Sequence, residues 1–128
     1  MNAPEVESVR RTLDQSMLDR YADASGDHNP IHVDEEFART TPMGGTIAHG
    51  MLVLSFISEM MAAAFGEAWL GSGSLDVRFR APARPGDSVM ARAAAQEPRE
   101  GRLRYGVECV SQGGDVLISG TAEVVLGA

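Results

Sequence analysis

The sequence predicts an α+β fold in which a curved antiparallel sheet wraps around one long buried helix. From about Ile47 to Phe65 almost every side chain is apolar, and a helix without a polar stripe must be buried on most sides. Residues 75–126 then contain stretches in which apolar and polar side chains alternate, which is typical of half-buried strands. Glycine-containing turns separate these stretches, so we expect antiparallel strands that cover the helix.

The segment before the long helix predicts one strand and two short helices. Weak alternation over residues 6–15 indicates a first strand, and Ser16 is the expected N-cap of a helix over about residues 17–24. Gly26 should end that helix. Acidic side chains at the start of segment 34–39 suit the positive end of a second short helix.

Turn residues divide the remainder of the chain. Segment 40–46 contains Pro42, Gly44 and Gly45, and it is either a flexible flap beside a pocket or a plain connecting loop. After the long helix, alternation and turn signals predict four strands. These strands cover residues 75–80, 88–96, 103–109 and 116–126.

Composition indicates one ordinary globular domain over residues 1–128. Hydrophobic residues make up 44% of the chain and charged residues 23%, and no linker-like stretch divides it. The N-terminus has no apolar signal-sequence core, and polar residues break the longest apolar stretch, so we expect a cytoplasmic protein without a membrane span. Cys109 is the only cysteine, so an internal disulfide is excluded and the thiol is expected to be buried and inert.

The charge distribution argues against nucleic acid as a partner, because binding to phosphates usually requires a basic surface. The net charge is −7, and residues 1–70 carry it with eleven acidic residues and four arginines. Residues 71–128 contain seven charges of each sign. All eleven basic residues are arginine, whose planar guanidinium suits the recognition of phosphate. The alternative for each strand arginine is that it only solvates an exposed face.

The segment that contains Asp27 and His32 combines two groups that can move a proton. Pro30 lies between them, removes a backbone donor and disfavours helical geometry at Asn29, so the backbone should bend. A bend can turn the carboxylate and the imidazole toward one point, where they form a candidate acid/base pair. The alternative is that Asp27 only forms a turn after Gly26 and that His32 is an ordinary polar loop residue.

Gly50 lies near the start of the long apolar segment. The first N–H groups of a helix lack partners within the helix, and the helix dipole is positive there. The Gly50 N–H is therefore a candidate donor to an oxygen that gains negative charge during a reaction. His49 is expected to have a supporting role, and His28 is expected to face solvent.

A metal or nucleotide cofactor is not expected. His28 and His32 have the spacing of zinc ligands on a helix, but Pro30 interrupts the helix that would place both rings on one face. The sequence also contains no glycine-rich nucleotide loop after a strand and no convincing serine nucleophile motif.

Two stretches resemble the MaoC-like hydratases and dehydratases, which include the (R)-specific enoyl-CoA hydratases. The sequence YADASGDHNPIH, from Tyr21 to His32, is similar to the hydratase motif of that family, and Ala48-His49-Gly50-Met51 resembles the start of its central helix. A weaker similarity extends the resemblance over nearly the whole chain. It consists of Phe79-Arg80-Ala81-Pro82 followed by Pro85-Gly86-Asp87.

The resemblance implies a hot-dog fold, a dimer with the pocket near the subunit interface, and (R)-specific hydration of a trans-2-enoyl-CoA or the reverse dehydration. Coenzyme A would be part of the substrate, so no separate cofactor is expected. Asp27 and His32 would activate water, and the Gly50 N–H would bind the thioester oxygen. Two competitors share the fold: a thioesterase that hydrolyses the acyl-CoA, and a non-catalytic subunit of a heteromeric complex. The complete motif argues against both.

Four further residues are expected to bind the substrate. Asn29 and Ser58 match positions near the family's active site, and Arg80 lies in the strand signature. Asn29 equally suits an Asx turn, and Ser58 equally suits a helix hydroxyl bonded to its own backbone. Met51 is expected to help close an acyl tunnel together with other apolar side chains of the long helix. These side chains are Phe56, Ile57 and Met60.

Overall fold

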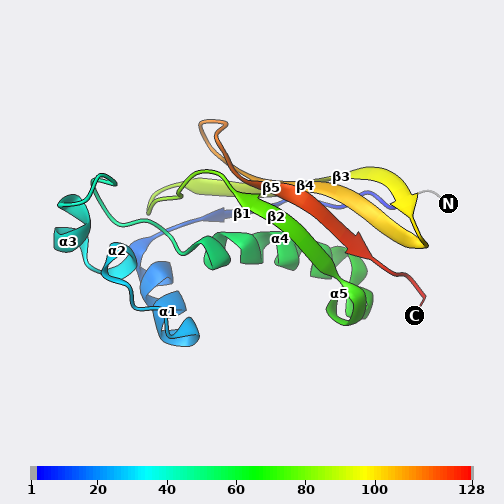
Figure 1. Cartoon of the computed structure of the whole chain (residues 1–128), viewed down its shortest axis with the longest axis horizontal. Coiled ribbons are helices and arrows are strands. Elements are labelled where there is room, and N and C mark those ends of the chain that lie inside the picture. Colours follow the sequence, from blue (N-terminus) through cyan, green and yellow to red (C-terminus); the bar gives the residue numbers. More distant parts are fainter. Residues whose placement is uncertain (1–2, 128) are drawn as a thin grey trace.

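The computed structural model describes residues 3–127, and its largest element is one five-stranded antiparallel sheet that curves around a helix (Figure 1). The strand order is β1-β3-β4-β5-β2, and every neighbouring pair is antiparallel. The strands are β1 (Val9–Thr12), β2 (Ser74–Phe79), β3 (Ser88–Arg99), β4 (Arg102–Ser111) and β5 (Val116–Val124). The helices are α1 (Gln15–Ser25), α2 (Pro30–Val33), α3 (Glu35–Arg39), α4 (Gly50–Phe65) and α5 (Glu67–Ser72). The predicted α+β architecture is confirmed.

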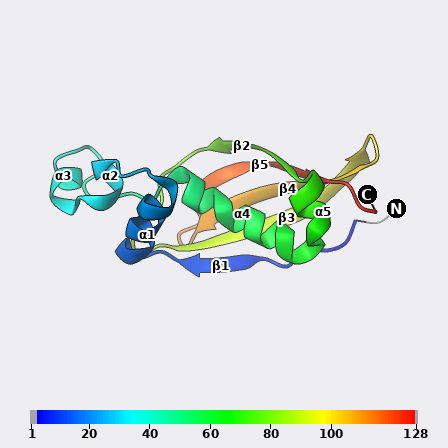
Figure 2. The same ribbon diagram turned by 90° about the horizontal axis from the view of Figure 1, so that it is seen from below.

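Helix α4 lies across the concave face of the sheet, and β1 and β2 form opposite edges (Figure 2). The side of α4 that faces the sheet is fully apolar, and Ile57, Met60 and Met61 have no exposed surface. They pack in one cluster with the inward side chains of the long strands, such as Leu103 and Tyr105. Burial of these side chains removes large apolar areas from water and is the main stabilising term of the fold.

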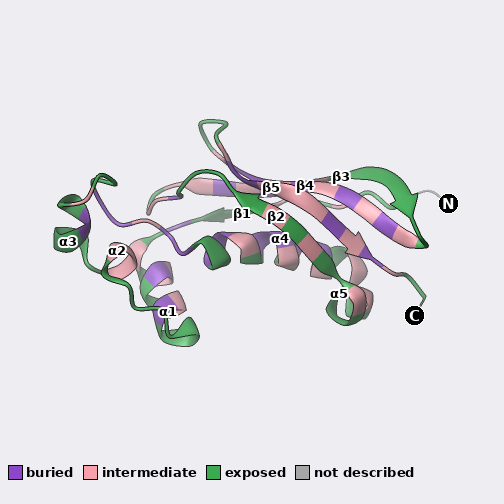
Figure 3. Cartoon of the chain, in the orientation of Figure 1, coloured by how far each residue is buried: buried purple, intermediate pink, exposed green. Residues whose placement is uncertain are grey.

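The side of α4 that points away from the sheet is open in the single chain. Met51 is 58% exposed, and Ser55 and Glu59 are exposed one and two turns further on. Figure 3 shows this as green segments on the far side of the helix. The prediction that α4 is buried on most sides is therefore wrong for the isolated chain, because one sheet covers only one face of a helix.

The first helix begins earlier than the sequence predicts. Asp14, and not Ser16, is its N-cap: the Asp14 Oδ1 accepts the Met17 N–H at 2.9 Å and the Ser16 hydroxyl at 2.7 Å. The hydrogen bond from Ser16 is the main cause that holds the pKa of Asp14 below its usual value, and the bond from the Met17 N–H acts in the same direction. Gly26 ends the helix in the left-handed conformation, as predicted.

Helix α5 is absent from the sequence prediction. Gly71 within the helix and the flanking Gly66 and Gly73 give the segment the composition of a loop, but Trp69 is buried and anchors it to the core. Gly73 is required here, because a Cβ at this position would lie 2.4 Å from the Trp69 ring. The first strand is shorter than predicted. Strand β3 extends beyond the predicted end to Arg99, and its pairing with β4 has an irregular register after Gln96.

Helices α1 to α3 project beyond the end of the sheet at which α4 begins, with α3 farthest out (Figure 1). The segment predicted as a bent loop over residues 27–31 includes the start of the one-turn helix α2. The Asn29 side chain caps that helix, and Pro30 occupies its first position, where a missing N–H costs nothing. This short helix positions His32 against the segment that leads into α4.

Candidate active site

The structure brings Asp27 and His32 together. The Asp27 Oδ2 lies 3.8 Å from the His32 Nε2, which is too far for a direct hydrogen bond. The Asp27 side chain is 53% exposed, whereas that of His32 is 12% exposed, so the pair spans the boundary between solvent and interior. One water oxygen at about 2.8 Å from each atom can bridge this separation.

The backbone fixes which nitrogen of His32 is free. The His32 Nδ1 lies 2.8 Å from the carbonyl oxygen of Ile47. A carbonyl only accepts hydrogen bonds, so Nδ1 carries the proton and the neutral ring has its lone pair on Nε2. That lone pair is on the nitrogen that faces Asp27, so His32 is ready to accept a proton there.

The second oxygen of the Asp27 carboxylate is held by the loop. Its Oδ1 accepts the Asn29 N–H at 3.2 Å, and the Asp27 N–H donates to the Ser25 hydroxyl at 3.1 Å. Asp27 is thus a turn residue as well as the partner of His32. The two roles use different carboxylate oxygens, so the turn orients the oxygen that faces the imidazole.

Gly50 is the first residue of α4, and its N–H has no hydrogen-bond acceptor among residues 3–127. No side chain caps this end of the helix, so the unpaired N–H lies at the positive end of the helix dipole. The Gly50 Cα lies against the Phe79 ring of the edge strand β2. A Cβ at Gly50 would be 3.0 Å from the Phe79 Cε1.

A pocket of about 340 Å³ lies between these groups. His32 and Gly50 lie on its wall, and strand β2 with the chain that follows it closes the opposite side. The other lining residues are Ile47, Ala48, Val53, Phe79, Arg80, Ala81, Pro82, Ala83 and Ile118. The lining is mostly apolar with few polar groups, which is typical of small-molecule sites.

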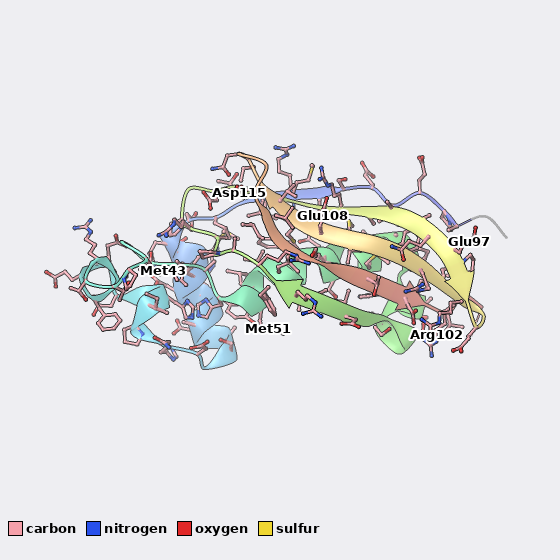
Figure 4. All side chains as sticks on the ribbon, turned by 45° about the horizontal axis from the view of Figure 1, so that its top comes forward. Met43, Met51, Glu97, Arg102, Glu108 and Asp115 are labelled. Atoms are coloured by element: carbon pink, nitrogen blue, oxygen red, sulfur yellow. The ribbon has the colours of Figure 1, made fainter. Side chains whose placement is uncertain are left out.

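The residues expected to bind substrate are distributed unevenly around this pocket. Arg80 lies on its wall, where its Nε donates to the Ser119 hydroxyl. Met51 lies at the start of α4 and is exposed outside the pocket lining (Figure 4). Asn29 uses its side-chain oxygen to cap α2, and the Ser58 hydroxyl accepts the Trp69 indole N–H at 3.0 Å. Their substrate-binding roles stay predictions.

The expected acyl tunnel along the long helix stays a prediction, because the other side chains named for it do not line the pocket among the described residues. Phe56, Ile57 and Met60 are buried in the core between α4 and the sheet and do not line the pocket. Segment 40–46 also lies outside the pocket lining. It acts as a connecting loop whose last residue, Thr46, is buried and bonded to Gln15 and Glu35.

Gln15 and Phe79 are contributors that the sequence did not predict. The Gln15 side chain donates to the His32 carbonyl at 2.8 Å and accepts the Thr46 hydroxyl at 2.7 Å, so it ties the two halves of the site together. Phe79 ends the alternating strand β2, where it is 56% exposed and its ring lies beside Gly50. Its place at the end of an alternating run next to the strand signature is the only signal that the sequence offers.

Comparison with known proteins identifies the family of the chain. The family model of the MaoC like domain matches residues 2–112. The chain belongs to this family. As a MaoC-like protein it is 36% identical to the 3-hydroxybutyryl-CoA dehydratase of Methylorubrum extorquens over 92% of this chain and 76% of that protein. It is 35% identical to the (R)-specific enoyl-CoA hydratase of Rhodospirillum rubrum over 94% of this chain and 85% of that protein.

A solved structure confirms the hot-dog fold. The (R)-hydratase from A. caviae involved in PHA biosynthesis superposes with a TM-score of 0.83 at 27% identity, and the match covers 98% of each chain. This MaoC-like chain is accordingly an enzyme of the hydro-lyase class, the class of the named hydratases and dehydratases. No helix in the described part of the chain is long and apolar enough to cross a membrane.

One group of metal-binding residue types lies within the described residues of this MaoC-like protein. Asp27, His32 and His49 each offer a ligand atom, and these atoms lie within 4.8 Å of one another. The two imidazoles are stacked with their planes 24° apart, so their in-plane lone pairs lie in nearly parallel planes and do not point at one ion between the rings. The donor set therefore fits proton transfer better than metal coordination.

Proposed function

We propose that this protein hydrates trans-2-enoyl-CoA to the (R)-3-hydroxyacyl-CoA, or catalyses the reverse dehydration, with no metal or nucleotide cofactor. The observation that carries the proposal is the free Nε2 of His32, which lies 3.8 Å from the Asp27 carboxylate. His32 and Gly50 both line the pocket, and Asp27 lies just outside its lining. Addition of water to an unsaturated thioester needs a base, a proton for Cα and a donor to the thioester oxygen.

Each step of the reaction has a group in this site. A water between Asp27 and His32 attacks Cβ while His32 Nε2 takes one of its protons, and the C=C π pair moves into the thioester as an enolate. The Gly50 N–H donates to the enolate oxygen. The proton held by the dyad then returns to Cα as the enolate collapses, so the product contains one added water and the enzyme is restored. Dehydration follows the same steps in reverse.

Arg80 is our proposed contact for the coenzyme A part of the substrate. Its guanidinium lies on the pocket wall, held by the Ser119 hydroxyl, and it forms no ion pair within residues 3–127. An unpaired guanidinium suits bidentate binding of a phosphate. The names of the relatives, a 3-hydroxybutyryl-CoA dehydratase and an (R)-specific enoyl-CoA hydratase, support the CoA carrier and the (R) configuration.

The active form that we propose is a homodimer. Strand β2 pairs only with β5, so its outer edge has unpaired backbone groups, and an exposed sheet edge is normally covered. Phe79 on β2 is 56% exposed and Met51 on α4 is 58% exposed. Light scattering during gel filtration should give twice the chain mass of 13.6 kDa, whereas the single-chain mass would contradict the proposal.

The activity is tested by following the loss of enoyl-thioester absorbance over a series of trans-2-enoyl-CoAs of increasing chain length. Asp27→Asn removes the charge at constant size, and His32→Asn keeps a donor for the Ile47 carbonyl but has no titratable nitrogen. Each should lower kcat by about 10²–10⁴-fold, the usual contribution of a general base. His28→Asn is the matched control, because His28 is exposed and pairs only with Asp23.

Parallel assays separate the competing functions. Thiol release from a saturated acyl-CoA without hydration would establish a thioesterase, and inactivity of a well-folded dimer in both assays would favour a non-catalytic subunit. Chiral separation of the hydrated product tests the stereochemistry, and formation of the (S) isomer would contradict that part of the proposal.

A further inference from the structure

His49 contacts both members of the proposed dyad. It is the residue immediately before α4 and is only 2% exposed. Although it occupies the N-cap position, its side chain makes no capping hydrogen bond to the helix. The ring points instead toward the segment between α1 and α2, so its burial serves contacts other than a helix cap.

Two contacts define what the ring does. The His49 Nε2 lies 2.9 Å from the carbonyl oxygen of Asp27 and therefore donates its proton to the backbone of that residue. The face of the ring stacks on His32, with the ring centroids 3.9 Å apart. Tyr21 packs against His49 as well, at a centroid distance of 4.8 Å and a tilt of 58°, so His49 is enclosed between the two rings and the loop backbone.

The electrostatic surroundings keep the ring neutral. Burial is the main cause that holds the pKa of His49 below its usual value, and the proximity of His32 acts in the same direction, while the Asp27 carbonyl opposes them. His28 adds a weaker repulsion and the Asp27 charge a weaker attraction. The His49 Nδ1 is buried and has no hydrogen-bond partner among the described residues, so a proton on it would have no acceptor there.

We infer that His49 is a positioning residue that fixes both halves of the dyad at once, the Asp27 backbone through its Nε2–H and the plane of the His32 ring through stacking. The inference rests on the proposed function for its catalytic meaning. No direct hydrogen bond maintains the 3.8 Å separation of Asp27 and His32, so it depends on the groups that hold each residue, and His49 contacts both of them. A neutral His49 ring can hold both residues in place without competing for the proton that His32 takes up on Nε2.

A merely structural core histidine would make a different prediction. Its loss would lower stability and leave the kinetics of the folded fraction unchanged. A positioning residue instead lowers kcat with little change in KM, because the substrate still binds but the reacting groups are misplaced.

Three substitutions separate the two contacts. His49→Phe keeps a ring that can stack on His32 and removes the donor, His49→Gln keeps a donor near the Nε2 position and removes the ring, and His49→Ala removes both. We expect kcat per folded protein to fall about 10-fold in the Phe and Gln variants and about 100-fold in the Ala variant, with KM within about 3-fold of the parent. His28→Ala is the matched control. Full kcat in the folded Ala variant would overturn the inference.

A readout that does not depend on activity separates failure of this inference from failure of the proposed function. Long-range 1H–15N NMR spectra report which nitrogen of each histidine is protonated. The parent should show His32 protonated on Nδ1 and His49 on Nε2. In His49→Ala the His32 ring loses the stacking that holds it against the Ile47 carbonyl, so it should become a mixture of both tautomers, while His28→Ala should not cause this change. If His32 keeps a single tautomer in the folded Ala variant, His49 does not position it, whether or not the parent hydrates enoyl-CoA.

Discussion

Gly50→Ala is the sharpest test of the pocket geometry, because it places a methyl group beside the proposed oxyanion donor and leaves that donor, the backbone N–H of residue 50, in place. The Gly50 backbone does not have the positive φ that would require glycine, so alanine fits the helix start without backbone strain. The added Cβ, however, would lie 3.0 Å from the Phe79 Cε1 and 3.1 Å from its Cδ1. Ordinary carbon contacts are about 3.5–4.0 Å, so the ring must move by about 0.5 Å or more.

The expected magnitudes differ for stability and activity. Phe79 is more than half exposed and can turn away, so the free energy of unfolding should change by less than about 1 kcal/mol. The ring and the methyl group both line the pocket next to the Gly50 N–H, and displacement of a substrate by about 1 Å can cost about 10²-fold in rate. We therefore expect kcat/KM to fall about 10- to 100-fold, or about 1.4–2.7 kcal/mol of transition-state stabilisation.

Steady-state hydration kinetics and urea unfolding of the same preparations test this reasoning. Gly71→Ala is the matched control, because a Cβ there meets nothing within 4 Å and activity should be unchanged. Phe79→Leu in the Gly50→Ala background makes room for the methyl group and should recover part of the loss. Unchanged kcat/KM in Gly50→Ala would refute the placement of the thioester at the start of α4.

Three further measurements probe the core, the acid range and the thiol. Met60→Ala should lower the unfolding free energy by about 2–5 kcal/mol in urea titrations, because Met60 has no exposed surface. Because the pKa of His49 is lowered, the unfolded chain binds a proton below about pH 6.5 that the folded chain does not bind. The stability of the parent should therefore fall as the pH is lowered from about 7 to 5, and it should fall less steeply in His49→Phe. The raised pKa of His28 acts oppositely, since its stabilisation is present below about pH 6.5 and is lost at higher pH, so both proteins should carry His28→Ala. Burial raises the pKa of Cys109 to about 12, and its thiol should react with a disulfide reagent at neutral pH only after unfolding, as absorbance of the released thiol would show.

The sequence predicts most of the fold because its strongest signals are periodic. Alternation places the strands β2, β4 and β5 within a few residues of their observed ends, and the apolar run identifies α4. Local chemistry is less decisive where two residues suit one role. Asp14 and Ser16 are both good N-caps, and only the structure shows that the serine hydroxyl donates to the carboxylate that caps the helix.

The candidate site is predictable in its residues and less so in its contacts. Gly26 and Pro30 predict a bend in the backbone, and the structure brings Asp27 and His32 close to each other. Nothing local in the sequence indicates that the His49 ring stacks on His32, because that contact joins segments 17 residues apart. The open face of α4 is equally hidden, since apolar composition does not tell a face covered by the sheet from a face left for another subunit.

Two segments, residues 27–34 and 46–50, form the site only through bonds that cross between them. The Ile47 N–H donates to the Ile31 carbonyl, the His32 Nδ1–H to the Ile47 carbonyl, and the His49 Nε2–H to the Asp27 carbonyl. Two of these three bonds come from imidazole rings, and the same bonds decide which nitrogen of each ring is free. The contacts that shape the pocket therefore also decide which ring nitrogens carry protons. His32 keeps a free lone pair on Nε2 toward Asp27, and the neutral His49 donates its Nε2–H to the backbone. A change that separates the two segments must alter the base as well as the pocket, even when it touches neither catalytic side chain.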